Sequence, residues 1–88
     1  MFHYVYVIQH TLTKQIYIGY THDLKRRIQE HNLGLQRATQ RKGGKWILVY
    51  CEVYRRKEDA IVREKKLKQH GSNLRWLKDR IKHSLLKD

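Results

Sequence analysis

Two runs of β-branched and aromatic residues, joined by a short polar segment, open the chain. Residues 3–9 read HYVYVIQ, residues 15–20 read QIYIGY, and HTLTK lies between them. Residues of these types favour strands. Because the connection between the runs is short, the pattern predicts an antiparallel hairpin at the start of the fold.

The alternation of side chains along these strands sorts them between two faces of the sheet. In the first strand, Tyr6 lies on the face opposite Val5. In the second strand, Tyr17 and Gly19 share the face opposite Ile18. Because Gly19 has no side chain, we expect a backbone segment or a phosphate to approach it closely.

A helix is predicted to follow the hairpin. Thr21 is a suitable N-cap, and Asp23 suits the positive end of the helix dipole. The helix is expected to run to about Asn32, after which Gly34 can close it in a left-handed conformation.

The faces of this helix differ in character. Leu24 and Ile28 lie one turn apart and mark the stripe that we expect to be buried. Arg27 and His31 also lie one turn apart, on the neighbouring strip. Each is structural or solvated on the simplest interpretation. On the functional interpretation, Arg27 neutralises a phosphate and His31 positions a water or donates to an oxygen.

The second half of the chain starts with a long basic loop, residues 34–45, which reads GLQRATQRKGGK. Loops of this length are usually functional or mobile. Residues 46–54, WILVYCEVY, are nearly all apolar and predict a strand buried on both faces, hence either central in the sheet or covered by helices. Cys51 in this run is expected to be a small buried hydrophobe.

Two helices complete the expected fold. The first runs from about Lys57 to His70, and the second follows the GSN at 71–73. The apolar stripe of the second helix consists of Leu74, Leu77, Ile81 and Leu85. The order β-β-α-β-α-α predicts one α+β domain over residues 1–88, with a three-stranded, mainly antiparallel sheet flanked by helices.

The charge of the chain indicates a polyanionic partner. Twenty Lys and Arg stand against eight Asp and Glu, which gives a formal net charge of +12 in 88 residues. Nucleic acid is the first such partner to consider; an anionic membrane surface or a ribosome-like assembly stays open. No apolar run is long enough to span a membrane, and no secretory leader opens the chain, so we expect a cytoplasmic protein.

One acidic residue lies where an apolar one is expected. Glu64 shares the inward stripe of its helix with Ala60 and Leu67. A carboxylate on that face must be paired, protonated or bound to a cation. It either forms an ion pair with a nearby basic group such as Arg63 or Lys68, or binds a divalent metal such as Mg²⁺ or Mn²⁺.

The two strand tyrosines, Tyr6 and Tyr17, also allow two interpretations. Tyrosines in strands commonly serve packing. As a functional pair, one hydroxyl would accept a proton from an attacking water and the other would bind a phosphate or orient that water. A tyrosine base requires a lowered pKa, which nearby cations and a metal would supply.

Together these residues resemble the GIY-YIG nuclease superfamily. Tyr6 precedes YIG at 17–19, Arg27 and His31 follow on the next helix, and Glu64 lies on a later one. The stretches DLKRRIQEHNLG and AIVREKKLK are similar to the segments around the arginine and the glutamate of the family. The likeness spans nearly the whole chain and is greatest to small stand-alone members related to the nuclease domain of the excinuclease C subunit.

The resemblance implies a hydrolase of DNA phosphodiester bonds that depends on one divalent metal ion, Mg²⁺ or Mn²⁺. It makes Tyr6 the general base and Tyr17 its assistant. It further implies that Arg27 stabilises the phosphate and that His31 matches a histidine found in many members. Glu64 corresponds to the single metal-binding acid.

The chain departs from the family pattern at two positions. Val5 precedes Tyr6, so the first motif lacks its glycine and isoleucine, and Tyr20 stands where some members carry a lysine. The absence of that lysine removes a cation near the tyrosines. A catalytically weak or inactive nucleic-acid-binding module is therefore the second interpretation. A basic subunit that docks on a larger nucleoprotein complex is the third.

DNA is expected to bind a surface that is largely basic. The candidate contacts are Gly19, Arg26, Arg37, Arg41, Lys42 and Lys45. Without an appended DNA-binding domain, we expect weak sequence preference or recognition of DNA shape, such as branched or damaged DNA. A protein partner is a further source of specificity, and DNA repair or recombination is the expected setting.

Overall fold

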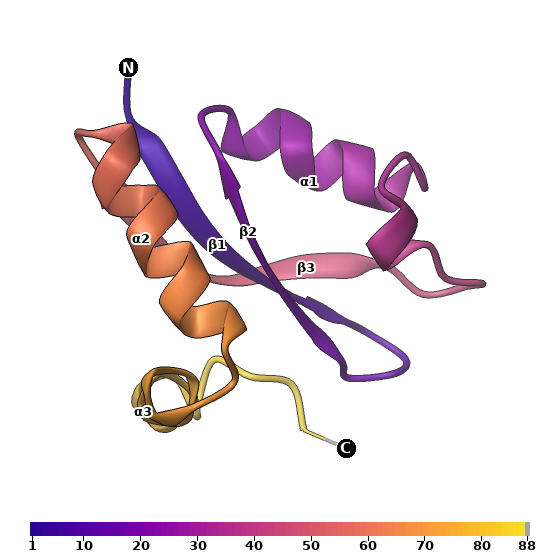
Figure 1. The fold of residues 1–88 in the computed structure, drawn as a ribbon. Coiled ribbons are helices and arrows are strands. Elements are labelled where there is room, and N and C mark those ends of the chain that lie inside the picture. The colour runs from indigo at the N-terminus through magenta and orange to yellow at the C-terminus, as the bar shows by residue number, and fades with distance from the viewer. Residues whose placement is uncertain (88) are drawn as a thin grey trace.

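The computed structural model describes residues 1–87. Three antiparallel strands form one sheet, and three helices pack on it (Figure 1). The elements are β1 (His3–His10), β2 (Ile16–Thr21), α1 (Leu24–Asn32), β3 (Trp46–Tyr54), α2 (Lys57–Lys68) and α3 (Ser72–Arg80). This order confirms the predicted α+β fold.

The central strand of the sheet is β1, because the strand order is β2-β1-β3. The prediction that residues 46–54 form a strand buried on both faces, hence central or covered by helices, is therefore wrong, because β3 lies at an edge of the sheet. Side chains of β3 are mostly half-buried or exposed, and Cys51 is half-buried rather than buried. A continuous apolar run does not reveal whether a strand has neighbours on both edges. β1 has both, because its hairpin partner occupies one edge and β3 the other.

The predicted alternation in the hairpin separates two hydrophobic cores, and Figure 1 shows α1 and α2 on opposite sides of β1 and β2. Tyr6, Ile8 and Trp46 form the core that α1 covers. Val5 and Ile18 belong to the other core. That second core is completed by Val7, Ala60, Leu67, Leu74, Leu77 and Ile81.

Helix α1 begins later than predicted. Its N-cap is Asp23, whose carboxylate accepts a hydrogen bond from Arg26 N at 3.2 Å. Thr21 instead ends β2, and its hydroxyl oxygen accepts from Asp23 N at 3.0 Å. Both residue types cap helices well, and because β2 continues through Thr21, the cap falls to Asp23. Gly34 has a φ of 75° after the helix, as predicted.

The two later helices are shorter than their patterns suggested. α2 ends at Lys68, and His70 adopts a left-handed φ of 56°. α3 ends at Arg80, so Leu85 of the predicted stripe packs against the core from beyond the helix. None of the helices within residues 1–87 combines the length and apolar character needed to cross a membrane.

A hydrogen-bond network around one carboxylate, that of Glu52, connects α2 to β3. Glu52 accepts hydrogen bonds from the hydroxyls of Tyr50 and Tyr54 at 2.7 and 2.6 Å. It also accepts from Nε and Nη2 of Arg63, at 2.9 and 3.0 Å. Burial on its own raises the pKa of Glu52, but the bonds from Arg63 and the two tyrosines outweigh burial and lower that pKa below its usual value.

Glu52→Gln is expected to lower the free energy of unfolding by about 2 kcal/mol at neutral pH, because it breaks a half-buried network. Since folding lowers the pKa of Glu52, its stabilisation is complete above the unfolded-state pKa of about 4.3 and is lost as the pH falls through the folded-state value. Urea titrations should therefore show the difference from wild type shrinking below about pH 4.

Glu58→Gln is the matched control, because Glu58 pairs with Arg56 where both side chains are exposed. The pKa of Glu58 is also lowered, first by a backbone hydrogen bond and then by Arg56, but solvent screens these contacts, so this variant should lose much less stability than Glu52→Gln. A Glu52→Gln deficit that stayed constant down to about pH 3 would show that titration of Glu52 is not its source.

Candidate active site

The position of the Tyr6 hydroxyl is set by a glycine on the neighbouring strand. Tyr6 of β1 and Gly19 of β2 are paired in the sheet, on the face that α1 covers. A Cβ atom added to Gly19 would overlap Oη and Cζ of Tyr6. The sequence predicts room for a phosphate at Gly19, whereas the structure fills that room with the Tyr6 ring.

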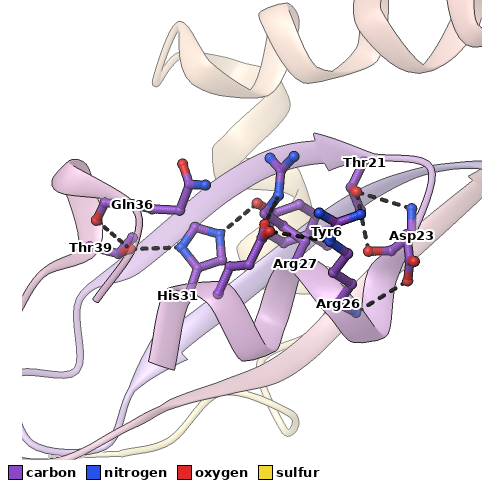
Figure 2. A network of polar contacts seen from close by, with 9 residues as sticks. Tyr6, Thr21, Asp23, Arg26, Arg27, His31, Gln36 and Thr39 are labelled. Atoms are coloured by element: carbon purple, nitrogen blue, oxygen red, sulfur yellow. Dashed lines mark hydrogen bonds and ion pairs between the residues drawn. The ribbon is translucent and has the colours of Figure 1, made fainter. Parts of the chain in front are cut away.

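A chain of hydrogen bonds leads from Tyr6 into the basic loop (Figure 2). Tyr6 Oη lies 2.7 Å from His31 Nε2, and His31 Nδ1 lies 2.7 Å from Thr39 Oγ1. The Thr39 hydroxyl donates to the backbone oxygen of Gln36 at 3.2 Å. Tyr6, His31 and Thr39 are 1%, 2% and 1% exposed, so the chain is shielded from solvent.

His31 is the buried residue of α1, while the predicted stripe residues Leu24 and Ile28 are half-buried. The helix therefore turns its histidine toward the sheet more fully than its aliphatic side chains. Burial lowers the pKa of His31, and the charge of Arg27 lowers it further. His31 is accordingly neutral at physiological pH.

Tyr17, Arg27 and Glu64 all act on the Tyr6 hydroxyl. Burial is the main cause that raises the pKa of Tyr6, and Tyr17 raises it further. Arg27 lowers this pKa, and Glu64 raises it slightly. The expectation of a lowered tyrosine pKa is therefore wrong in the free protein, because burial outweighs the single nearby cation. The residues proposed from the sequence nevertheless lie around one hydroxyl.

Arg27 lies between solvent and the buried tyrosine. Its side chain is 35% exposed, and its Nε donates to Glu30 Oε1 at 3.0 Å. Arg26, which is 73% exposed, pairs with the same carboxylate at 3.4 Å. Both arginines line a hollow of about 170 Å³ at the start of α1. The hollow is lined by these two guanidinium groups and by the carboxylates of Asp23 and Glu30, so its formal charge is balanced in the free protein.

Tyr17 lies on β2, and Glu64 lies on α2, which packs against β2. The Tyr17 ring centre lies 6.5 Å from that of Tyr6 and 5.1 Å from that of His31. Lys68 Nζ lies 5.2 Å from the centre of the Tyr17 ring and 3.3 Å from Glu64 Oε2. The ion-pair interpretation of Glu64 is thus confirmed with Lys68, whereas Arg63 binds Glu52 instead.

A protein-family comparison identifies the family of the chain. The family model for the GIY-YIG catalytic domain matches residues 2–78. The chain belongs to the GIY-YIG family. This is the domain of a nuclease superfamily, and the resemblance drawn from the sequence is confirmed.

Relatives of this GIY-YIG protein are small proteins of similar length. The chain is 35% identical over 81 residues to a UPF0213 protein of Staphylococcus aureus, covering 89% of this chain and 96% of that one. It is 33% identical over 69 residues to a UPF0213 protein of Haloquadratum walsbyi, covering 78% and 76%. The solution NMR structure of a UPF0213 protein from Bacillus halodurans matches with a TM-score of 0.54 at 31% identity, covering 88% and 81%.

The GIY-YIG site offers a sparse set of metal ligands. Within residues 1–87 no three His, Cys, Asp or Glu side chains gather as a cage. Glu64 contributes one carboxylate, 18% exposed, at the edge of the site. Mg²⁺ commonly binds through one or two carboxylates, several waters and substrate phosphates. The donor set therefore fits a hard cation shared with a bound phosphate, and it does not fit a structural zinc.

The basic residues of the loop are exposed beside this GIY-YIG site. Arg37, Arg41, Lys42 and Lys45 are all exposed. The Arg41 guanidinium lies 5.6 Å from the centre of the Trp46 ring and donates to Gln15 Oε1 at 2.9 Å. The loop thus presents cations to solvent while its base is fixed to the sheet.

Sequence reasoning missed two features of the site. Thr39 lies in a short 3₁₀ turn (Arg37–Thr39) inside the loop, and nothing in the loop sequence marks it as a partner of His31. The sequence predicts Lys68 as an ion-pair partner of Glu64, one turn away, but it does not predict the contact of Lys68 with the Tyr17 ring. That contact depends on how α2 packs on β2. The Lys68–Tyr17 contact joins segments far apart in the sequence, whereas the Thr39–His31 contact depends on the path of the irregular loop between them.

Proposed function

We propose that this GIY-YIG protein is a metal-dependent endonuclease that hydrolyses DNA phosphodiester bonds with low sequence specificity. The observation that supports this most directly is the Tyr6 hydroxyl, which is hydrogen-bonded to His31, lies near Tyr17, and feels the charges of Arg27 and Glu64. A proton acceptor, a phosphate-binding cation and a hard-metal ligand are the groups that hydrolysis of a phosphodiester needs.

In the proposed reaction Tyr6 transfers a proton without existing as a free phenolate. Its raised pKa makes a standing phenolate unfavourable. As a water attacks the phosphorus, one water proton moves to Tyr6 Oη and the Tyr6 proton moves to His31 Nε2. His31 becomes an imidazolium and releases its extra proton to solvent after the product leaves. Neutral His31 is the acceptor that this path requires.

Arg27 controls access to the buried hydroxyl in this proposal. Tyr6 is 1% exposed, whereas the Arg27 side chain is 35% exposed and lies beside the hydroxyl. A phosphate that binds Arg27 draws the guanidinium outward and admits the attacking water. The same guanidinium then neutralises the charge that grows on the phosphate.

Glu64 is the proposed metal ligand. A divalent cation bound there would polarise the phosphate and stabilise the leaving oxygen. Lys68 holds Glu64 in the free protein and must release it, and its ammonium then stays near Tyr17. Lys68 thereby supplies a cation close to the tyrosines, where Tyr20 replaces the lysine of some relatives.

The loop residues Arg37, Arg41, Lys42 and Lys45, together with Arg26, are the proposed contacts to DNA phosphates. Phosphate contacts position a protein on DNA and carry no sequence information directly. We therefore infer that the protein selects DNA by shape, as in branched or damaged DNA, or through a protein partner. Repair or recombination is the setting that suits such an activity.

The second candidate function is nucleic-acid binding without cleavage. Burial of Tyr6 and the raised pKa of its hydroxyl favour it, because both oppose proton transfer. The Lys68–Glu64 ion pair also competes with metal binding at Glu64.

Glu64→Gln is expected to reduce Mg²⁺- or Mn²⁺-dependent cleavage about 100-fold or more, because several kcal/mol of charge stabilisation are lost. Cleavage is to be measured on duplex, branched and single-stranded DNA, and DNA binding by fluorescence anisotropy. Binding should survive, since the variant removes a negative charge from a basic surface. Glu58→Gln is the control and should cut normally. Absence of metal-dependent cleavage by the wild type on all three substrates would favour the binding function.

A further inference from the structure

Thr39 differs from its neighbours in the basic loop because its side chain faces inward. It is 1% exposed, while Arg37, Ala38 and Gln40 are exposed. Its hydroxyl lies between His31 Nδ1, at 2.7 Å, and the backbone oxygen of Gln36, at 3.2 Å (Figure 2). A single hydroxyl thus connects the turn of the loop to the histidine beside Tyr6.

The direction of each hydrogen bond from Tyr6 to the loop is assigned from the last acceptor, the backbone oxygen of Gln36. A backbone carbonyl accepts and cannot donate, so the Thr39 proton points to Gln36 O. With its proton on Gln36 O, which also accepts from Thr39 N at 3.1 Å, Thr39 Oγ1 accepts from His31, and the proton of the imidazole is on Nδ1. The lowered pKa of His31 keeps the ring neutral. Its Nε2 therefore carries a lone pair, and the Tyr6 hydroxyl donates to it.

We propose that Thr39 is a positioning residue that holds His31 in the Nδ1–H tautomer, so that Nε2 stays free to accept the Tyr6 proton. This inference rests on the proposed nuclease function and adds to it the group that sets the direction of proton transfer. In the other tautomer, Nε2–H would donate to Tyr6 Oη. The Tyr6 proton would then have no acceptor on His31, and the transfer would stop.

The same turn is tied to the rest of the fold. The Thr39 backbone oxygen accepts from Trp46 Nε1 at 2.8 Å, and Trp46 is 4% exposed at the start of β3. Arg37 belongs to the turn, and Arg41 follows it over the Trp46 ring. A loop proposed to contact DNA phosphates therefore carries the residue that orients the proton acceptor.

The test compares Thr39→Val, which has the shape of threonine without its hydroxyl, with Thr39→Ser, which keeps the hydroxyl. Nitrogen-15 NMR of the histidine rings in the full chain reports which nitrogen of His31 carries the proton. Wild type and Thr39→Ser should show the Nδ1–H form. Thr39→Val should show a mixture or the Nε2–H form, because Tyr6 can either donate to Nε2 or accept from it. Thr39→Ala takes the place of the valine variant if the latter does not fold.

Kinetics provide the second measurement. The kcat of Thr39→Val should fall about 10- to 100-fold, the usual effect of removing an outer hydrogen-bond partner, while KM stays unchanged because Thr39 is buried. Thr39→Ser should restore kcat. Thr13→Val, in the hairpin turn, is the control for loss of a threonine hydroxyl and should behave as wild type.

Two results would overturn the inference. One is a wild-type protein whose His31 is in the Nε2–H form. The other is a Thr39→Val variant that keeps the Nδ1–H form completely. Failure of the proposed nuclease function can be distinguished from failure of this inference, because the NMR measurement of the His31 tautomer does not depend on DNA cleavage. A wild type that cuts no DNA but shows the expected tautomers supports the hydrogen-bond direction and overturns the nuclease function.

Discussion

Gly19→Ala is expected to reduce DNA cleavage about 100-fold, although it adds a single methyl group. The new Cβ would overlap the oxygen and Cζ of Tyr6, so the tyrosine ring must move. A displacement of about 1 Å at a reacting group costs about 100-fold in rate. Overpacking should also lower the free energy of unfolding by about 1–3 kcal/mol. Cleavage rates at saturating DNA and urea titrations measure the two effects.

Gly71→Ala is the matched control for this substitution. Gly71 lies before α3, has a negative φ and has nothing within reach of an added Cβ. It should keep cleavage and serves as the control for that measurement; because Gly71 is the N-cap of α3, where Ala is less favourable than Gly, a modest loss of stability is expected that involves no clash with Tyr6. Wild-type cleavage by Gly19→Ala would mean that the position of the Tyr6 ring does not matter for the reaction, and it would remove Tyr6 from the proposed mechanism.

Tyr6→Phe is expected to reduce cleavage by about 10²–10⁴, the range that a general acid or base contributes. The ring remains to fill the space across Gly19, so the sheet keeps its packing. His31 Nε2 loses its partner in a buried position, which should cost about 1–3 kcal/mol of stability. Single-turnover cleavage with excess enzyme separates the loss in the chemical step from any loss in binding.

Tyr4→Phe is the control for the loss of a phenol on the same strand. Tyr4 lies on β1 and is half-buried, and its change should leave cleavage unaffected. If Tyr6→Phe cut DNA nearly as well as wild type, the base would have to be another group. Tyr17 would be the first to test, because its ring is close to both Tyr6 and His31.

The elements of this fold were predictable because their signals are local. The alternation in residues 3–9 and 15–20 correctly assigned Tyr6 and Val5 to opposite faces. The order of strands was not predictable in the same way. The apolar run at 46–54 indicated a buried strand, but which strand lies in the middle depends on long-range pairing that no local pattern contains.

The site shows the same division. Arg27, His31 and Glu64 were recognised through spacing and resemblance, and the structure places them around Tyr6 or in contact with it. The burial of His31 was not predicted, because a histidine beside an aliphatic stripe is usually half-exposed. Thr39 could not be predicted either, since its contact with His31 depends on how the loop folds back over α1.

The placement of β2 has a consequence for how the protein would lose activity on heating. Tyr6 and His31 lie in the layer under α1, whereas Glu64 and Lys68 come from the helix on the opposite layer. The two groups meet around β2, an edge strand whose single hydrogen-bonded neighbour is β1. Edge elements open locally at a lower free energy than the whole domain. Fraying of β2 would withdraw Tyr17 from the site and Ile18 from its core while the β1–β3 pairing persisted, so inactivation would precede global melting.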